Sequence, residues 1–169
     1  LTTFTDKKLE GFDAVIATGS NNAARYFDYY FSKYPHIIRK NKNGIAVLNG
    51  AENQDDMKNL GKDMLQYFGL GCRNVSKLYL PKGFDLNMVF GGLFPFANII
   101  QMNKYANNYD YNKAVYLMSE FDDALDPLKS HLQEQQEKIQ CVASNADIEG
   151  ASPFGEAQDP QLWDYADGV

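Results

Sequence analysis

The stretch FDAVIATGSNNAARYFDYYF (residues 12–31) decides the expected fold of this chain. Residues 12–18 form a short apolar run, which is typical of a strand buried in a parallel sheet. Gly19 and Ser20 mark a turn, and apolar side chains then recur at helical spacing at Ala23, Ala24, Tyr26, Phe27, Tyr30 and Phe31. The stretch therefore predicts a strand, a turn and a helix, as in α/β proteins.

The same alternation of strand runs and helical patterns continues along the chain. Strands are predicted near Val15, Ile45, Leu78 and Val142. A helix is predicted after Asn53, which can cap its first turn, and Gly69 is expected to end it. Further helical patterns cover residues 86–105, with a break near residues 91–95, and residues 111–121. We expect an α/β fold in three layers, with helices covering a mostly parallel sheet.

Composition and charge restrict the classes of partner. The chain has 169 residues, of which 44% are hydrophobic, enough to bury the core of one domain. Its net charge of −6 argues against binding to nucleic acid or to an anionic membrane surface. The longest apolar stretch, residues 89–100, is interrupted by two glycines and a proline, so we expect no membrane span. Two widely separated cysteines and two histidines offer no metal-ligand spacing.

The candidate for chemistry is Cys72, within YFGLGCRNVSKLYLP (residues 67–81). It follows a helix pattern and precedes a strand pattern, and Gly69 and Gly71 leave space for a substrate to approach the backbone. An accessible thiolate in such a loop is suited to nucleophilic attack, so we expect Cys72 to be exposed in a cleft. The alternative is a small buried residue without chemistry, which is our interpretation of Cys141 in its predicted strand.

Three stretches together resemble one family: residues 15–27, residues 67–81 and residues 153–169. They are similar to the acyl-CoA reductases, which include the fatty-acid reductase of bacterial bioluminescence and belong to the aldehyde dehydrogenase superfamily. The resemblance spans nearly the whole chain. It implies the aldehyde-dehydrogenase-like three-layer catalytic domain, in which a Pro-Phe-Gly turn, here at residues 153–155, lies near the substrate entrance.

The resemblance also implies a division of the chain into three parts. Residues 1–35 would be the remnant of a nucleotide-binding domain, residues 36–152 the catalytic domain, and residues 153–169 a C-terminal segment. Because the family has a larger nucleotide-binding region upstream of the Gly19 turn, we expect a fragment that does not reduce acyl-CoA by itself. The lack of a signal peptide, together with a nucleophile that must stay reduced, predicts a cytoplasmic protein.

The chemistry that the resemblance implies is the reduction of a fatty acyl thioester, such as acyl-CoA, to an aldehyde with NADPH or NADH. Cys72 would attack the thioester carbonyl, release CoA and carry the acyl group, with its backbone N–H stabilising the oxyanion. Thr18, Gly19 and Ser20 would lie against the nicotinamide end of the cofactor. His36 would donate or accept a proton, although a hydrogen-bonded histidine at a strand edge is the simpler interpretation.

One departure from the superfamily favours a reductase. Aldehyde-oxidising relatives carry a glutamate in a Glu-Leu-Gly-Gly motif some three dozen residues before the cysteine, where it activates water to hydrolyse the acyl-enzyme. The equivalent residues 34–44 contain no carboxylate. A reductase has no use for that hydrolysis, so the absence agrees with its chemistry.

Two alternatives stay open on the sequence alone. One is a CoA-acylating aldehyde dehydrogenase, which works mainly in the opposite direction on short aldehydes. The other is a non-catalytic domain that only binds or oligomerises. A homodimer is compatible with any of these, since dimers are common in the superfamily.

Overall fold

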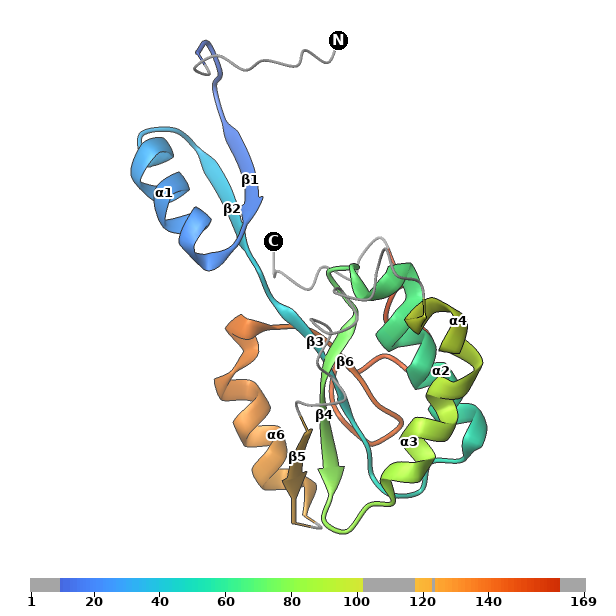
Figure 1. The fold of residues 1–169 in the computed structure, drawn as a ribbon. Helices are drawn as coiled ribbons and strands as arrows, with labels where there is room; N and C mark the ends of the chain where they lie inside the picture. Colours follow the sequence, from blue (N-terminus) through green and yellow to red (C-terminus); the bar gives the residue numbers. More distant parts are fainter. Residues whose placement is uncertain (1–9, 102–117, 123, 162–169) are drawn as a thin grey trace. The chain divides into compact units, whose positions relative to one another are not determined.

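The computed structural model describes residues 10–101, 118–122 and 124–161 and divides the chain into two compact units (Figure 1). One unit is Leu1–Asn41 and the other is Lys42–Val169. Each unit contains a parallel sheet of its own.

The first unit is a strand, a helix and a second strand. β1 (Val15–Gly19) and β2 (His36–Lys40) pair in parallel, and α1 (Asn21–Phe31) connects them. Ser20 caps the helix, since its side-chain oxygen accepts a hydrogen bond from Ala23 N at 3.2 Å. The predicted strand, turn and helix are thus confirmed, but the predicted burial of the strand is wrong, since Ile16 in β1 is 79% exposed.

The boundary between the units corrects the predicted division of the chain. It lies after Asn41 and not after residue 35, because β2 pairs with β1 along its whole length. In the sequence, Arg39 and Lys40 are typical of a solvated connection. In the structure both are exposed, but the backbone that carries them is part of the parallel ladder.

The second unit is built on a four-stranded sheet. In spatial order its strands are β5 (Met118–Phe121), β4 (Val75–Pro81), β3 (Asn43–Val47) and β6 (Ile139–Ala143). All three neighbouring pairs are parallel. The mostly parallel sheet of an α/β fold is therefore confirmed, with strands at the positions predicted from Ile45, Leu78 and Val142.

Helices cover both faces of this sheet (Figure 1). α2 (Gln54–Leu65) and α3 (Leu86–Leu93) pack together on one face, and α6 (Leu125–Glu134) covers the other. Asn53 caps α2 as predicted, and the side chain of Asp56 accepts a hydrogen bond from the Asn53 N–H to complete a capping box. Helices, sheet and helix make the three layers that the sequence predicts.

Two apolar cores lie on opposite faces of the sheet. The core under α2 and α3 includes Ala46, Leu48, Met57, Leu60, Met64, Leu78, Leu80 and Val89. The core under α6 is formed by Ile45, Val47, Tyr79, Leu128 and Leu132. Successive residues of β3 and β4 alternate between the two cores, as the two-residue period of a strand requires. Phe154 and Ala157 are buried in the first core, so this part of the predicted C-terminal segment belongs to the second unit.

Two elements of the second unit differ from those predicted. β5 is a strand where the sequence predicts a helix over residues 111–121, of which residues 111–117 lie outside the described part of the chain. α6 has no counterpart among the predicted helices. Its N-cap residue is Ala124, whose side chain makes no capping hydrogen bond, so the usual signal for a helix start is missing.

The break in the predicted helix over residues 86–105 comes at its proline. α3 continues through Gly91 and Gly92, and the irregular turn η2 (Phe94–Phe96) then separates it from α4 (Ala97–Ile100). Gly92 is required for packing, because a Cβ there would overlap the backbone of Met57 in α2. The last residues of this prediction, from 102 on, are not described.

Candidate active site

Cys72 follows an unusual turn of the backbone. α2 ends at Leu65, and the next residues form the turn η1 (Gln66–Gly69). Tyr67, Phe68 and Gly69 have φ angles of 55°, 60° and 72°, so three successive residues are left-handed. Glycine adopts this conformation readily, but for other residues it costs roughly 1–2 kcal/mol each. The surrounding contacts must therefore hold this segment in place.

Cys72 itself lies in a tight turn over residues 71–74. Asn74 N donates to Gly71 O at 3.0 Å, and Gly71 N donates to Asn74 Oδ1 at 2.6 Å. These reciprocal hydrogen bonds leave Cys72 at the corner of the turn. A Cβ on Gly71 would lie 2.6 Å from Asn74 Oδ1, so only glycine fits beside the cysteine.

The two cysteines are both free thiols, but only Cys72 is exposed, and Cys141 is buried. Among the described residues, no hydrogen bond involves either the thiol or the backbone N–H of Cys72. One residue can therefore present an attacking sulfur together with a donor for an oxyanion. The predicted exposure of Cys72 and burial of Cys141 are confirmed. We also expected Cys72 to lie in a cleft, but it lies at a surface turn and lines neither of the two cavities described below.

Asn74 anchors this turn to the end of α2. Its side chain is buried, and Nδ2 donates to Asp63 O at 2.8 Å and to Gln66 O at 3.1 Å. The last carbonyls of a helix have no partner within the helix. Asn74 therefore satisfies backbone groups that would otherwise lack a hydrogen bond.

Arg73 anchors the same turn to a segment far along the chain. Its side chain is buried, and Nε donates to Ala157 O at 2.6 Å. The Arg73 carbonyl accepts a hydrogen bond from Cys141 Sγ at 3.4 Å. The buried cysteine thus supports the turn that carries the exposed one.

A buried carboxylate, Asp63, holds residues 153–157 in place. Its Oδ2 accepts a hydrogen bond from Gly155 N at 2.6 Å, and its Oδ1 accepts one from Ala157 N at 3.1 Å. Burial raises the pKa of Asp63 to about 6, while these two N–H groups and Lys62 act in the opposite direction. Lys62 Nζ also donates to Gly155 O at 2.6 Å, so two neighbouring side chains of α2 fix the Pro-Phe-Gly turn.

Thr18, Gly19 and Ser20 lie where β1 passes into α1, in the first unit. Gly19 is required for packing, since a Cβ there would lie 2.9 Å from Ala23 Cβ and 3.3 Å from the Phe27 ring. Ser20 is occupied as the helix cap. Thr18 is exposed near the carboxyl end of a parallel strand, which is the edge where α/β proteins commonly bind ligands.

His36 is the first residue of β2. Its Nδ1 lies 2.8 Å from Tyr34 O, so this nitrogen is assigned the proton, and its Nε2 lies 4.0 Å from a carboxylate oxygen of Asp28. These contacts agree with a hydrogen-bonded histidine at a strand edge. The predicted site residues are thus divided between the units, with Cys72 in the second and the other four in the first.

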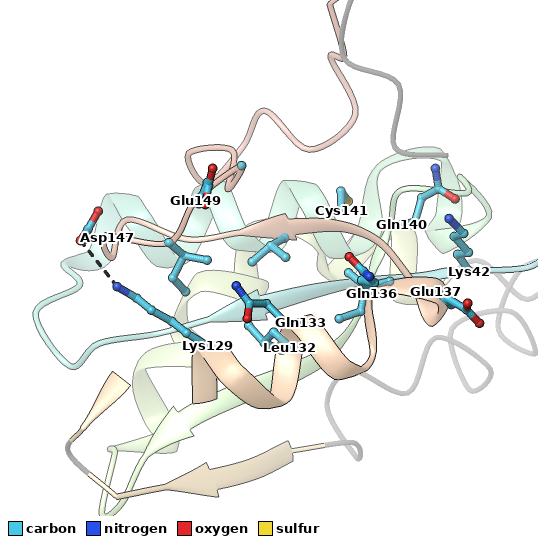
Figure 2. Close-up of a pocket in the computed structure, with 14 residues that line it drawn as sticks. Lys42, Lys129, Leu132, Gln133, Gln136, Glu137, Gln140, Cys141, Asp147 and Glu149 are labelled. Atoms are coloured by element: carbon cyan, nitrogen blue, oxygen red, sulfur yellow. Dashed lines mark ion pairs between the residues drawn. The ribbon is translucent and has the colours of Figure 1, made fainter. Parts of the chain in front are cut away.

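The larger of two described cavities is a groove of about 1050 Å³ along α6, β6 and residues 147–150 (Figure 2). Its lining carries charges of both signs, and Lys129 Nζ pairs with Asp147 at 3.5 Å. Cys141 borders the groove, but its thiol donates to the backbone of Arg73. A second cavity of about 530 Å³ is lined by β4, β5 and α6. Cys72 lines neither cavity.

No family model matches this chain, and no curated protein matches it. None of the helices in the described part of the chain has the length and apolar character that crossing a bilayer requires. In the same part, no three His, Cys, Asp or Glu side chains gather as a metal-binding group. The candidate site therefore rests on the geometry around Cys72.

The sequence points to Cys72 but not to the buried polar residues that hold it. Asn74, Arg73 and Asp63 each bond to backbone groups, and the groups bonded to Arg73 and Asp63 lie 84 or more positions away in the sequence. The signal that was available is the position of Asp63 beside Met64 and Leu65 in an apolar helix pattern. A carboxylate on a buried face needs hydrogen-bond donors, so it predicts a packed segment nearby.

Proposed function

We propose that this chain carries the catalytic cysteine of an acyl-CoA reductase, with Cys72 as the nucleophile. The supporting observation is the exposed Cys72 thiol on a braced turn, beside a backbone N–H that is uncommitted within the described residues. The resemblance of three stretches of the chain to acyl-CoA reductases points to the same chemistry. The α/β fold is compatible with it.

In the proposed acylation step, the Cys72 thiolate attacks the carbonyl carbon of an acyl-CoA. A carbon–sulfur bond forms, the carbonyl becomes a tetrahedral oxyanion, and its collapse breaks the bond to the CoA sulfur. The proton given up by Cys72 leaves with the CoA thiol. The Cys72 N–H would donate to the oxyanion, and one such donor typically lowers the barrier by about 3–4 kcal/mol.

The reduction step requires a nicotinamide cofactor and a proton. NADPH or NADH, when bound, supplies the hydride that converts the acyl group to an aldehyde and frees the Cys72 thiolate. In the proposed arrangement Thr18 and the first N–H groups of α1 lie against the cofactor, since Gly19 and Ser20 are engaged in the strand–helix junction. His36 Nε2 would carry the proton that returns the freed Cys72 thiolate to the thiol, while Nδ1 stays bound to Tyr34 O.

Covalent labelling tests the acylation step directly. The chain is incubated with radiolabelled palmitoyl-CoA and run on a denaturing gel without added thiol. We expect label on the wild type and on Cys141→Ser, and none on Cys72→Ser. His36→Ala should slow turnover of the intact enzyme but leave acylation detectable. A wild type without label, or a Cys72→Ser protein that acquires it, would rule out the proposed nucleophile.

The same assay separates the two alternatives. Faster acylation by acetyl-CoA than by palmitoyl-CoA would favour a CoA-acylating aldehyde dehydrogenase that acts on short aldehydes. A Cys72 that resists both acyl-CoA and iodoacetamide would favour a non-catalytic binding or oligomerisation domain.

A further inference from the structure

Asn74 spans the left-handed segment that precedes Cys72. Its Nδ2 donates to the carbonyls of Asp63 and Gln66, which come before the segment, and its Oδ1 accepts from Gly71 N, which comes after it. Residues 67–70 are therefore closed into a loop by one buried amide.

This loop gains little stability from the side chains of Tyr67 and Leu70, two of its four residues. Tyr67 and Leu70 are 57% and 60% exposed, so neither gains much from packing. Tyr67 and Phe68 nevertheless keep the unfavourable left-handed conformation. Three hydrogen bonds from a buried amide are of the right order to offset that cost. The geometry of the Cys72 turn therefore depends on Asn74.

A second amide touches the same turn without holding it. The amide nitrogen and oxygen of Gln158 each lie 2.9 Å from the place that a Cβ on Gly71 would take. The Gln158 Nε2 is buried and has no hydrogen-bond partner among the described residues. Gln158 thus fills space beneath the turn, whereas Asn74 bonds to it, and the two amides form a matched pair for substitution.

We propose that Asn74 is a positioning residue for acyl transfer to Cys72: it holds the turn so that the Cys72 N–H faces the oxyanion formed at the thiol. This inference rests on the proposed function, since acyl transfer is the reaction whose geometry it concerns. Asn74 acts through the backbone and does not touch the substrate. Its loss should therefore affect reactions that form an oxyanion at Cys72 and spare reactions that do not.

Two small reagents make this distinction on the chain itself. p-Nitrophenyl acetate acylates a thiolate through a tetrahedral oxyanion and releases p-nitrophenolate. Iodoacetamide alkylates a thiolate by direct displacement of iodide, without an oxyanion. Neither reagent needs a CoA site, and peptide mass spectrometry assigns each adduct to Cys72 or Cys141.

We expect Asn74→Ala to slow acylation of Cys72 by p-nitrophenyl acetate and by palmitoyl-CoA at least about tenfold, which is part of the roughly 100- to 1000-fold that one oxyanion donor contributes. Alkylation by iodoacetamide should change less than about threefold, because Cys72 stays exposed. Asn74→Ser keeps an oxygen near Gly71 N and loses both N–H donors of the amide. Its acylation rate should therefore lie between those of the wild type and Asn74→Ala. Gln158→Ala should acylate like the wild type.

Amide hydrogen exchange gives a readout without any reagent. The Gly71 N–H is bonded to Asn74 Oδ1 and should exchange at least about tenfold faster in Asn74→Ala than in the wild type or Gln158→Ala. Cooperative urea unfolding shows that each variant is folded. If Asn74→Ala does not fold, the same rates are compared between Asn74→Ser and the wild type.

Three outcomes would overturn the proposal. These are an unchanged acylation rate in Asn74→Ala, acylation and alkylation slowed by the same factor, or a Gly71 amide exchange rate that is the same in Asn74→Ala as in the wild type. The proposed function can fail separately. In that case palmitoyl-CoA leaves the wild type unlabelled, while p-nitrophenyl acetate still acylates Cys72 in an Asn74-dependent way. A wild type that neither reagent acylates would reject both.

Discussion

Cys72 and Cys141 meet at Arg73, which follows the first cysteine in the chain and whose carbonyl accepts a hydrogen bond from the second. The two thiols therefore belong to one local structure, in which Cys141 is buried and hydrogen-bonded and Cys72 is exposed. A thiol needs an accessible sulfur to react, so the difference in exposure is a difference in chemistry.

We expect iodoacetamide to alkylate Cys72 at least about tenfold faster than Cys141 in the native protein, because Cys141 is buried and Cys72 is not. Peptide mass spectrometry after short exposures measures both rates. In urea the two rates should converge. Preferential labelling of Cys141, or a disulfide joining the two cysteines, would contradict this prediction.

Asp63 makes the stability of the second unit depend on pH. Its pKa is about 6 in the folded protein against an ordinary value of 3.8, so the folded state binds the proton more tightly. The stability that protonation contributes is fully present below pH 3.8 and is lost as pH rises through about 6.

Asp63→Asn removes this titration. Between about pH 8 and about pH 5, the unfolding free energy of the wild type should rise relative to that of Asp63→Asn by about 1 kcal/mol. Urea unfolding of both proteins at the two pH values measures the change, and other carboxylates cancel in the comparison. The same pH dependence in both proteins would show that Asp63 is not responsible.

At the scale of elements, α2 and α3 approach each other through glycines, Gly61 in the first helix and Gly92 in the second. A Cβ on Gly92 would meet the backbone of Met57, whereas a Cβ on its neighbour Gly91 would have no atom within 4 Å. Gly91 and Gly92 adjoin in one helix and differ only in what they face.

Gly92→Ala should lower the unfolding free energy by about 2 kcal/mol or more, because the helices must move apart to admit the methyl group. Gly91→Ala should raise it by up to about 1 kcal/mol, since alanine favours a helix more than glycine does. Urea unfolding of both variants tests the pair. Equal effects of the two substitutions would show that the close contact is not limiting.

The elements that the sequence predicts correctly carry local signals. Asn53 and Asp56 form a capping signal at the start of α2, and apolar runs indicate the strands around Ile45 and Leu78. β2 and β5 lack such signals, because strand pairing, not side-chain pattern, decides their conformation. α6 begins at Ala124 without a capping side chain, so only its packing under the sheet reveals it.

The candidate site likewise has one part that the sequence predicts and another part that it does not. Glycines on the N-terminal side of Cys72 make its exposure predictable from sequence, since they leave no side chain to cover it. The hydrogen bonds from Arg73 to Ala157 and from Gly155 to Asp63 join residues 84 and 92 positions apart. No local pattern encodes such a pair, so the support of the turn becomes visible only in the folded structure.

At the scale of the whole molecule, each unit has its own sheet, and both cores of the second unit are built from residues after Asn41. We therefore expect residues 42–169 to fold without residues 1–41. Urea unfolding monitored by circular dichroism should show one cooperative transition for the shortened chain, with Cys72 still alkylated faster than Cys141. A shortened chain without cooperative unfolding would contradict this expectation.

The dependence of the Cys72 turn on residues 155–157 has a consequence for how the protein is made. A ribosome adds about 5–20 residues per second, so the partners of Asp63 and Arg73 emerge roughly 5–18 s after them. Until then the nascent chain exposes an apolar face of the first core, which Phe154 and Ala157 later complete. Chaperones and proteases can recognise that face, and a chain truncated before residue 154 would be marked for removal before its thiol was ever held in place.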